Sequence, residues 1–403
     1  MICESKLLDF IFKQSRFLLF GLLTAFFASY GQTFFISLFN FQIRDSLNIT
    51  NASFGLIYSA ATILSSILLI WFGKLIDKID LRLFTLIVSI GLSISCFGMY
   101  LLKYSPHLIF FVIFGLRFFG QGAMGHTSQT SMARYYNENR GKAISFGSFG
   151  QPIGEMILPI IVVIIIKFSN WESVWLYAGT SIIIIFIPLY SFLLKDQAQR
   201  HKNFLEQQNK NNSAFDRRDV LKDPRFYIYL PSYLMPPFLV TGLLFYQMHI
   251  ANEKSWSLEL VATSFVFYGI FSVIGLIIGG PLVDKFKTRK IIPTYLIPMF
   301  IGIMLLAFRN EPIIMIIYMS LISFSTALAI PFMGSLWAEL YGVLNLGSIR
   351  SLLHAIGVFS TAISPFLFGL FIDWGLGIMF ICFFSLILIG ISTLLTFFYM
   401  NYR

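Results

Sequence analysis

Twelve long apolar runs constrain the fold of this chain more than any other feature. Each run is long enough for an α-helix to cross the ~30 Å of hydrocarbon in a bilayer, which takes roughly 20 residues. The runs are continuous rather than alternating, and a helix satisfies its own backbone hydrogen bonds in lipid, so helices are expected rather than strands. We therefore predict an all-α polytopic membrane protein with twelve transmembrane helices. The runs cover residues 17–38, 54–74, 83–102, 108–133, 142–166, 172–194, 226–249, 257–282, 291–308, 312–338, 347–372 and 376–399.

The composition agrees with a membrane protein and excludes other classes. Charged residues make up 12% of the chain, about half of the ~25% that is usual in soluble domains. High apolar content with few charges excludes disorder. A secreted disulfide scaffold is excluded because two of the three cysteines, Cys96 and Cys382, lie inside apolar runs. The first run is too long for a signal peptide and lacks a cleavage site, so it is predicted to remain as a span.

The distribution of cations predicts the topology. If the N-terminus is cytoplasmic, 23 of the 29 Lys and Arg residues fall in inside segments and five fall in outside segments. The positive-inside rule then places both termini in the cytoplasm. The net charge of +10 is thereby explained without nucleic acid as a partner. The expected location is the bacterial inner (plasma) membrane, and a monomer is expected.

One long polar segment divides the spans into six and six. Residues 195–225 carry eight cations and are predicted to form a cytoplasmic linker that touches anionic lipid. The predicted domains are thus an N-terminal six-helix bundle, residues 1–194, and a C-terminal six-helix bundle, residues 226–403.

The two halves share a repeated loop. GKLIDKIDLR begins at residue 73 and GPLVDKFKTR at residue 280, so both fit G-x-L-x-D-K-x-x-x-R at an offset of 207. A second landmark pairs Gly141 and Pro159 with Gly347 and Pro365 at an offset of 206. A duplicated unit with six spans keeps its orientation, so the halves are predicted to be parallel repeats.

On these loops the chain resembles the major facilitator superfamily, and the twelve-span plan extends the resemblance over nearly the whole sequence. The resemblance implies two bundles that rock about a central site. It also implies that the loop residues form a cytoplasmic gate, in which the glycine permits close packing and the charged residues latch the halves. The implied gate residues are Gly73, Asp77, Arg82, Gly280, Asp284 and Arg289. Glu339 and Arg350 flank the cytoplasmic loop between spans 10 and 11, as further gate residues or as ordinary helix-end charges.

Two charges inside predicted spans are the strongest candidates for a site. Arg117 lies about ten residues into span 4, ~15 Å deep, where a cation costs at least ~2.5–3.5 kcal/mol. Glu155 lies in span 5, at a depth that differs by only ~5 Å. Gln121 and Ser128 follow Arg117 on roughly the same helix face.

Three interpretations of Arg117 and Glu155 remain open. Arg117 binds an anionic substrate while Glu155 couples transport to protons, or the two form a structural ion pair, or each faces different neighbours. Neither charge recurs in the second repeat, because Arg117 aligns with about Ser323 or Phe324 and Glu155 aligns with Thr361. The fold does not require them, and this favours a functional role.

Other polar residues inside the spans are weaker candidates. Hydrogen bonds that only stabilise helix packing are the alternative explanation for each of them. The candidates for substrate binding are Gln32, Thr33, Gln151 and Gln247, and those for proton coupling are His126 and His354. The sequence contains no phosphate-binding loop, no metal-ligand spacing and no catalytic constellation, so neither a cofactor, a metal nor an enzyme activity is predicted.

Residues 117–159 and 336–365 resemble bacterial carriers near the oxalate/formate and monocarboxylate porters. Those porters place an arginine ligand in span 8, whereas residues 257–282 contain no cation. We predict secondary transport of a small organic anion, such as a monocarboxylate, by alternating access with proton coupling. The alternatives are a proton-driven exporter of amphipathic compounds, which the 46 Phe and 14 Met residues would suit, and a transporter-like sensor without flux.

Overall fold

The computed structural model describes most of the chain. The described residues are 2–77, 79–135, 140–195, 217–286, 288–341 and 346–401. Within them the side chains of residues 2–13, 77, 133, 134, 140–142, 217–219, 284, 338, 346–351, 354, 355, 400 and 401 are left out. All regular secondary structure in these ranges is helical, so the all-α prediction is confirmed.

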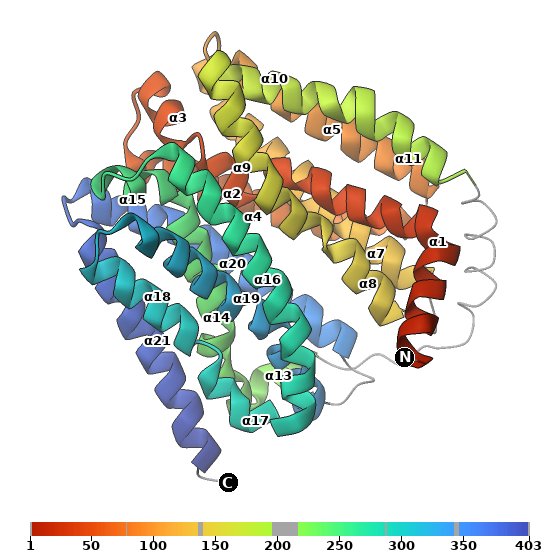
Figure 1. Cartoon of the computed structure of the whole chain (residues 1–403), viewed down its shortest axis with the longest axis vertical. Helices are drawn as coiled ribbons and strands as arrows, with labels where there is room; N and C mark the ends of the chain where they lie inside the picture. Colours follow the sequence, from red (N-terminus) through yellow and green to blue (C-terminus); the bar gives the residue numbers. More distant parts are fainter. Residues whose placement is uncertain are drawn as a thin grey trace. The chain divides into compact units, whose positions relative to one another are not determined.

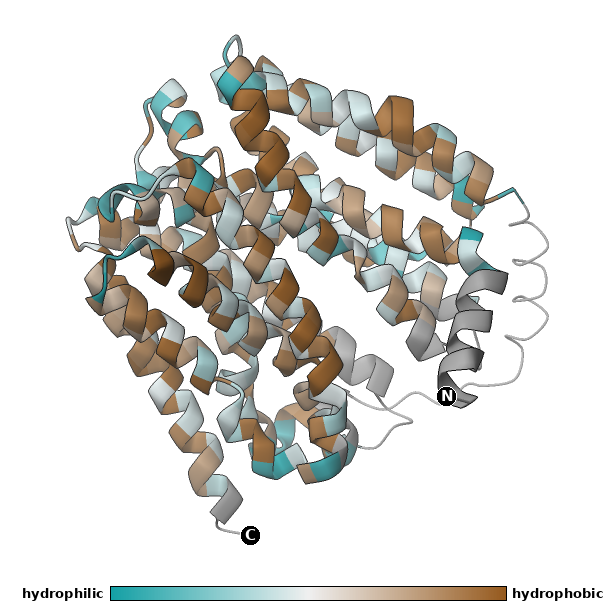
Figure 2. Cartoon of the chain, viewed as in Figure 1, coloured by the Kyte–Doolittle hydropathy of each residue, from teal (hydrophilic) through white to brown (hydrophobic). Residues whose placement is uncertain are grey.

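The prediction of twelve spans is also confirmed. Twelve helical segments are long and apolar enough to cross a membrane. Figure 2 shows hydrophobic colours along the long helices and hydrophilic colours mainly at helix ends and in connections. The spans are Gln14–Ser37, Asn51–Ile76, Leu81–Leu101, Pro106–Met132, Ala143–Phe168, Trp171–Leu193, Pro224–Phe245, Leu258–Val283, Thr288–Phe308, Pro312–Tyr341, Ile356–Asp373 and Ile378–Tyr399.

The chain forms two compact units, and the first contains most of spans 1 to 6. It comprises Met1–Ile36, Leu64–Gly154 and Ile164–Asn212. In this unit α5 lies beside α10, and α1 packs against α7 and α8 (Figure 1). The indole of Trp175 lies fully buried beside the ring of Phe35. Its elements are α1 (Ile2–Phe27), η1 (Ala28–Gly31), η2 (Gly73–Asp77), α5 (Leu81–Leu101), η3 (Pro106–Leu108), α6 (Ile109–Gly115), η4 (Leu116–Met124), α7 (Gly125–Arg134), α8 (Arg140–Ser148), α10 (Trp171–Ser181), η5 (Ile182–Phe186) and α11 (Ile187–Leu193).

The second unit comprises Ser37–Ile63, Glu155–Val163 and Ser213–Arg403. In it α16 packs along α19, α18 contacts α19 and α21, and α14 packs against α20. Its elements are α3 (Asn40–Leu47), α13 (Arg217–Lys222), α14 (Pro224–Phe245), α15 (Gln247–Glu253), α16 (Leu258–Phe286), α17 (Thr288–Ile291), η6 (Ile292–Thr294), α18 (Ile297–Phe308), α19 (Pro312–Tyr341), α20 (Leu346–Asp373) and α21 (Ile378–Asn401). Helices α2 (Thr33–Ser37), α4 (Asn51–Phe72) and α9 (Gly150–Phe168) contribute residues to both units.

The second unit therefore joins the ends of spans 1 and 2 to C-terminal helices. Asn40 Nδ2 donates a hydrogen bond to the Phe245 carbonyl at 2.8 Å. The rings of Tyr58 and Phe245 pack with their centroids 4.6 Å apart. These contacts lie at the predicted outer ends of spans 1, 2 and 7. The division into bundles 1–194 and 226–403 stays a prediction.

Candidate functional site

The type of helix in span 4 changes from α to π at the position of Arg117. Span 4 starts as η3 and α6, widens into the π-helical turn η4, and continues as α7. Such π-helical turns are uncommon, and they occur frequently at functional sites. Arg117 is the second residue of η4, and only 1% of its surface is exposed. The structure thus places the predicted cation inside the first unit, on an irregular part of its helix.

The first span is also interrupted, and Arg117 contacts the interruption. Helix α1 ends at Phe27, η1 follows, and Gln32 is extended before α2 begins at Thr33. Arg117 Nη1 lies 3.2 Å from the Gly31 carbonyl and 3.4 Å from Thr33 Oγ1. Both oxygens are uncharged, and the two hydrogen bonds orient the guanidinium.

A close contact between two glycines brings these segments together. A Cβ on Gly31 would lie 2.0 Å from the Leu116 carbonyl oxygen, and a Cβ on Gly120 would lie 2.6 Å from the Gly31 Cα. The backbone nitrogen of Gln121 is 2.8 Å from the same ideal position on Gly31. Only glycine permits this approach, so the contact fixes where Arg117 meets Gly31.

We expect Gly31→Ala to destabilise the folded protein by about 1–3 kcal/mol, as overpacking a tight contact does. The added methyl group must displace the η4 backbone, which cannot move as a side chain can. Thermal unfolding in detergent measures this effect as a lower melting temperature. Gly390→Ala is the matched control, since a Cβ there meets no atom within 4 Å. An unchanged melting temperature for Gly31→Ala would contradict the described contact.

The residues predicted to lie near Arg117 differ in their exposure and in their hydrogen bonds. Thr33 is buried against Arg117, whereas Gln32 and Gln121 are partly exposed beside the glycine contact. Ser128 donates its hydroxyl proton to the Gly21 carbonyl at 2.7 Å. The hydroxyl of Ser128 is thus used in packing α7 against α1, and we leave it out of the proposed site.

Span 5 carries the second predicted charge. Gly150 and Gly154 of α9 approach the first span closely, since Cβ atoms there would lie 2.0 Å from the Leu22 carbonyl and 2.3 Å from Ser29 Oγ. Gln151, between them, is exposed. Glu155 is 5% exposed and belongs to the second unit, where it lies within electrostatic range of the buried Tyr268 of α16. Sequence reasoning missed Tyr268, because an uncharged tyrosine in an apolar run gives no signal.

Gln247 is completely buried at the start of α15. Its Oε1 accepts a hydrogen bond from the Tyr318 hydroxyl at 2.5 Å. Its Nε2 has no hydrogen-bond partner among the described residues. A buried amide with an unused donor can accept a ligand, so Gln247 stays a candidate in the second unit.

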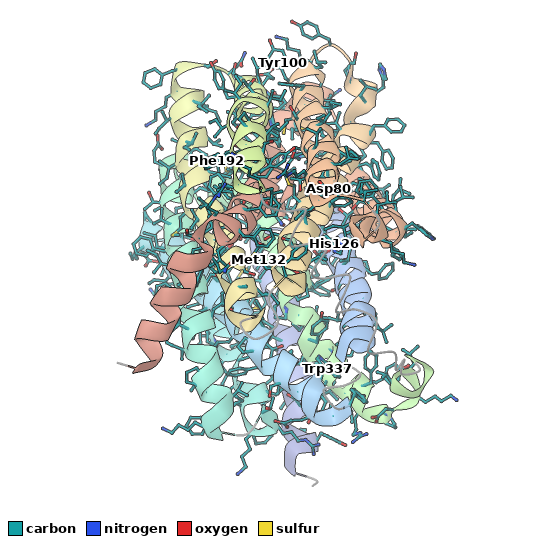
Figure 3. All side chains as sticks on the ribbon, turned by 90° about the vertical axis from the view of Figure 1, so that its right-hand side faces the viewer. Asp80, Tyr100, His126, Met132, Phe192 and Trp337 are labelled. Atoms are coloured by element: carbon teal, nitrogen blue, oxygen red, sulfur yellow. The ribbon has the colours of Figure 1, made fainter. Side chains whose placement is uncertain are left out.

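The first copy of the repeated loop is held by hydrogen bonds to backbone carbonyls. His126 Nε2 lies 3.2 Å from the Gly73 carbonyl, and because a carbonyl only accepts, this nitrogen must carry the proton. Arg82 Nε donates to the Leu194 carbonyl at 2.7 Å, and Arg16 donates to the Phe192 carbonyl at 2.9 Å. Both arginines thus stabilise the C-terminus of α11. Figure 3 labels His126 on α7 and Phe192 on α11.

The second copy of the loop makes different contacts. The Thr288 hydroxyl donates to the Glu339 carboxylate and lies 2.8 Å from Ser335 Oγ, beside Arg289. A Cβ on Gly280 would meet no atom within 4 Å, so this glycine is not tightly packed here. The remaining predicted gate and proton-coupling side chains lie outside the described ones; these are Asp77, Asp284, Arg350 and His354.

At the predicted outer face, a contact that the sequence did not reveal joins α4 to α20. The Asp373 carboxylate accepts hydrogen bonds from the backbone nitrogens of Asn51 at 3.1 Å and Ala52 at 2.7 Å, and from Asn51 Nδ2 at 3.0 Å. The Tyr246 hydroxyl lies 3.0 Å from the Asn51 carbonyl and 2.8 Å from the Pro365 carbonyl. We call Asp373, Asn51, Ala52, Tyr246 and Pro365 the outer clasp.

The family model described as "Major Facilitator Superfamily" matches residues 21–248 and 238–402. The chain is 23% identical over 395 residues to the uncharacterized MFS-type transporter YcxA of Bacillus subtilis (strain 168), covering 93% of each chain. It is 22% identical over 256 residues to the uncharacterized MFS-type transporter YfnC of the same strain, covering 62% of this chain and 61% of that one.

Solved structures show the same fold. A bacterial homologue of the human lysosomal transporter Spinster, in an inward-facing and occupied conformation, aligns with a TM-score of 0.69 at 13% identity, covering 95% of this chain and 96% of that one. The nucleoside transporter NupG aligns with a TM-score of 0.68 at 16% identity, covering 96% and 98%. With twelve apolar helices and a family match along both halves, this chain is an integral membrane transporter that belongs to the major facilitator superfamily.

Proposed function

We propose that this transporter moves a small organic anion, such as a monocarboxylate, together with protons. The observation that carries the proposal is the buried Arg117, whose Nη1 is oriented by the neutral oxygens of Gly31 and Thr33. A guanidinium can bind a carboxylate through two nitrogens. Gln32 and Gln121 flank the same contact and can complete the site.

We assign proton coupling to Glu155. A carboxyl in a dry site can change its protonation when its surroundings change during transport. Glu155, which is buried and within electrostatic range of Tyr268, fits this role. Substrate and proton would bind from one side and leave on the other. His126 hydrogen-bonds to the loop at Gly73, so we place it in the cytoplasmic gate rather than on the proton path.

Alternating access would follow from rocking of the halves 1–194 and 226–403 in the bacterial inner membrane, with both termini cytoplasmic. The outer clasp would close the outer side. The repeated loops at Gly73–Arg82 and Gly280–Arg289 would form the inner gate. The resemblance to oxalate/formate and monocarboxylate porters supports a carboxylate substrate.

Purified protein in proteoliposomes tests the proposal with a panel of radiolabelled carboxylates. An imposed inward proton gradient should drive accumulation of at least one of them by the unmodified protein. Glu155→Gln should lose this accumulation but retain exchange of labelled for unlabelled carboxylate, because the neutral amide mimics the protonated state. Glu311→Gln, at a side chain that is 55% exposed, is the matched control.

Two results would contradict the assignment. Proton-driven accumulation that is unchanged in Glu155→Gln would exclude its role. Absence of carboxylate exchange, together with efflux of amphipathic dyes that carboxylates do not inhibit, would instead identify an exporter of such compounds.

A further inference from the structure

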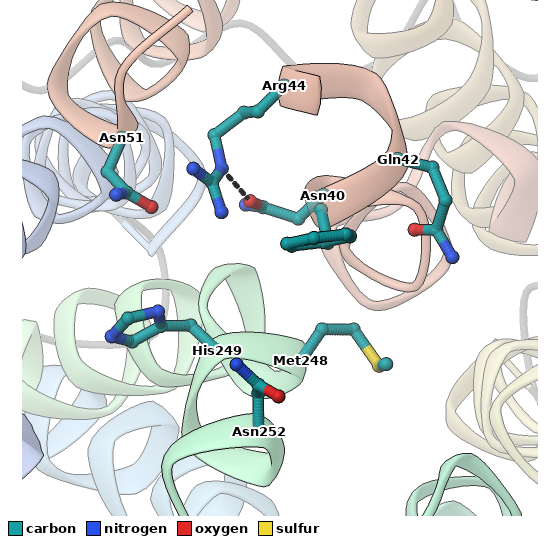
Figure 4. A pocket seen from close by; sticks show the side chains of 8 residues that line it. Asn40, Gln42, Arg44, Asn51, Met248, His249 and Asn252 are labelled. Atoms are coloured by element: carbon teal, nitrogen blue, oxygen red, sulfur yellow. Dashed lines mark hydrogen bonds between the residues drawn. The ribbon is translucent and has the colours of Figure 1, made fainter. Parts of the chain in front are cut away.

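A pocket with several polar side chains on its walls lies in the second unit. Its volume is about 370 Å³, and its walls come from α3, the start of α4, and α15 (Figure 4). Five of the side chains on its walls are amides or cations that could bind a ligand. The lining residues are Asn40, Phe41, Gln42, Arg44, Asn51, Met248, His249 and Asn252. The topology predicted from the cation distribution places this pocket on the outer side.

Arg44 supplies a fixed positive charge. Its Nε donates to Asn40 Oδ1 at 2.8 Å, while Asn40 Nδ2 donates to the Phe245 carbonyl. This chain of hydrogen bonds holds the guanidinium with its terminal nitrogens facing the pocket, as Figure 4 shows. Burial lowers the pKa of Arg44, but an arginine remains a cation at neutral pH.

The imidazole of His249 also lines the pocket that Arg44 lines. Burial is the main cause that lowers the pKa of His249, and the charge of Arg44 acts in the same direction, while Glu253 and Asp373 oppose it. The lowered pKa favours the neutral imidazole at neutral pH. Arg44 is therefore the cation of the pocket wall at this pH, and a single negative charge suits it.

The pocket also contains unused acceptors. Asn51 Oδ1 and Gln42 Oε1 are buried and have no hydrogen-bond partner among the described residues. The orientation of the Asn51 amide is fixed, because its Nδ2 donates to Asp373 at 3.0 Å. Buried acceptors without donors are rare in folded proteins, so each favours a ligand that brings a donor.

Three acidic residues lie near the pocket: Asp45, which acts electrostatically on Arg44, and Asp373 and Glu253, which already have partners. Asp373 binds the start of α4, and the Glu253 carboxylate accepts from the Ile378 nitrogen at 3.0 Å and lies 3.7 Å from His249 Nε2. Their charges disfavour a ligand with two negative groups. We propose that the pocket binds a small monoanion that carries a hydroxyl group. The anionic oxygens of this ligand accept hydrogen bonds from Arg44, and its hydroxyl group donates to Asn51 Oδ1 or Gln42 Oε1.

This inference extends the proposed function to a second, outer anion site, but it does not require transport. The anionic group could come from a free hydroxycarboxylate or from a phosphatidylglycerol headgroup, which has a phosphate and hydroxyls. Calorimetric titration of the protein in phosphatidylcholine nanodiscs tests the first source, with L-lactate and propionate as probes. The two probes differ in the hydroxyl group.

We expect L-lactate to bind with an Arg44-dependent component that persists in Arg117→Ala, which separates the pocket from the central site. Arg44→Ala should abolish this component, and Arg309→Ala, at an exposed outer arginine, should leave it unchanged. Gln42→Met, which removes an acceptor at similar size, should weaken lactate binding about 2- to 10-fold and leave propionate binding unchanged.

Native mass spectrometry tests the second source. Phosphatidylglycerol should remain bound to the unmodified protein and to Arg309→Ala but be lost from Arg44→Ala if the headgroup occupies the pocket. The proposal is overturned if neither lactate binding nor retained phosphatidylglycerol depends on Arg44. It is also overturned if lactate and propionate bind equally and Gln42→Met changes neither.

Discussion

Replacing Arg117 by alanine is expected to reduce carboxylate exchange at least about 30-fold. Truncating one partner of a buried charge pair costs about 2–5 kcal/mol, and each 1.4 kcal/mol is a factor of ten. Arg117→Lys keeps the charge but loses the planar pair of donors, so an intermediate loss of about tenfold is expected. The measurement is counterflow of the best carboxylate of the panel into proteoliposomes.

The control for charge is Arg309→Ala. Arg309 lies on the predicted outer surface, 62% exposed beside Glu311. Arg309→Ala removes one positive charge, as Arg117→Ala does, but from an exposed side chain. Carboxylate exchange should therefore remain unchanged. Transport by Arg117→Ala at the rate of the unmodified protein would exclude Arg117 as the ligand.

A second variant separates binding from folding. Thr33→Val removes the hydroxyl that lies 3.4 Å from Arg117 Nη1 while it keeps the shape of the side chain. Fold and melting temperature should therefore persist, while exchange falls about 2- to 10-fold through a less firmly oriented guanidinium. If Arg117→Ala unfolds, a loss of exchange in a folded Thr33→Val still supports the site.

The spans could be predicted because their cause is local. The length and apolarity of each run decide whether a helix crosses the bilayer. Both are properties of one continuous stretch of sequence. The burial of Arg117 could be predicted for the same reason, since its depth follows from its position in span 4. The family could also be identified, because the repeated loops at residues 73–82 and 280–289 are local patterns.

The partners of these residues could not be predicted, because they are distant in the sequence. The run 17–38 reads as one helix, yet the span breaks at Gly31 and Gln32, where η4 approaches through Gly120. Nothing in the sequence near Arg82 indicates that it donates to the carbonyl of Leu194, 112 residues away. Packing that brings remote segments together decides such contacts.

The same reason explains why the outer clasp gave no sequence signal. Asp373 reads as an ordinary acid at the end of span 11, and its partners are 321 and 322 residues away. Asn51 reads as the start of a sequon. Only the folded chain shows that the carboxylate accepts hydrogen bonds at the N-terminus of α4, where the first backbone nitrogens of a helix lack partners.

Replacing Asp373 by alanine is expected to shift the transporter toward a state with an open outer side. The variant loses hydrogen bonds from two backbone nitrogens and one amide, and a negative charge at a helix N-terminus. Together these stabilise the contact between α4 and α20 by about 1–3 kcal/mol, which corresponds to a population shift of about 5- to 150-fold. Asp373→Asn keeps one acceptor, so its shift should be smaller.

Electron paramagnetic resonance measures this shift with spin labels at Leu56 and Trp374. Both side chains are exposed, at 52% and 66%, so spin labels can be attached there. The population with a longer distance between the labels should grow in Asp373→Ala. Asp45→Asn, at an exposed acid on α3, is the control and should not change the distribution. An unchanged distribution in Asp373→Ala would exclude the carboxylate as a latch.

Tyr246 provides an independent test of the outer clasp. Its hydroxyl reaches the carbonyls of Asn51 and Pro365 at 3.0 and 2.8 Å, so it links α4 and α20 through the backbone rather than through a charge. Tyr246→Phe should lengthen the label distance less than Asp373→Ala does, because a neutral hydrogen bond contributes about 0.5–1.5 kcal/mol. Since both residues act on the first turn of α4, their effects should be less than additive in the double variant. Fully additive effects would show that the two contacts hold the outer side independently.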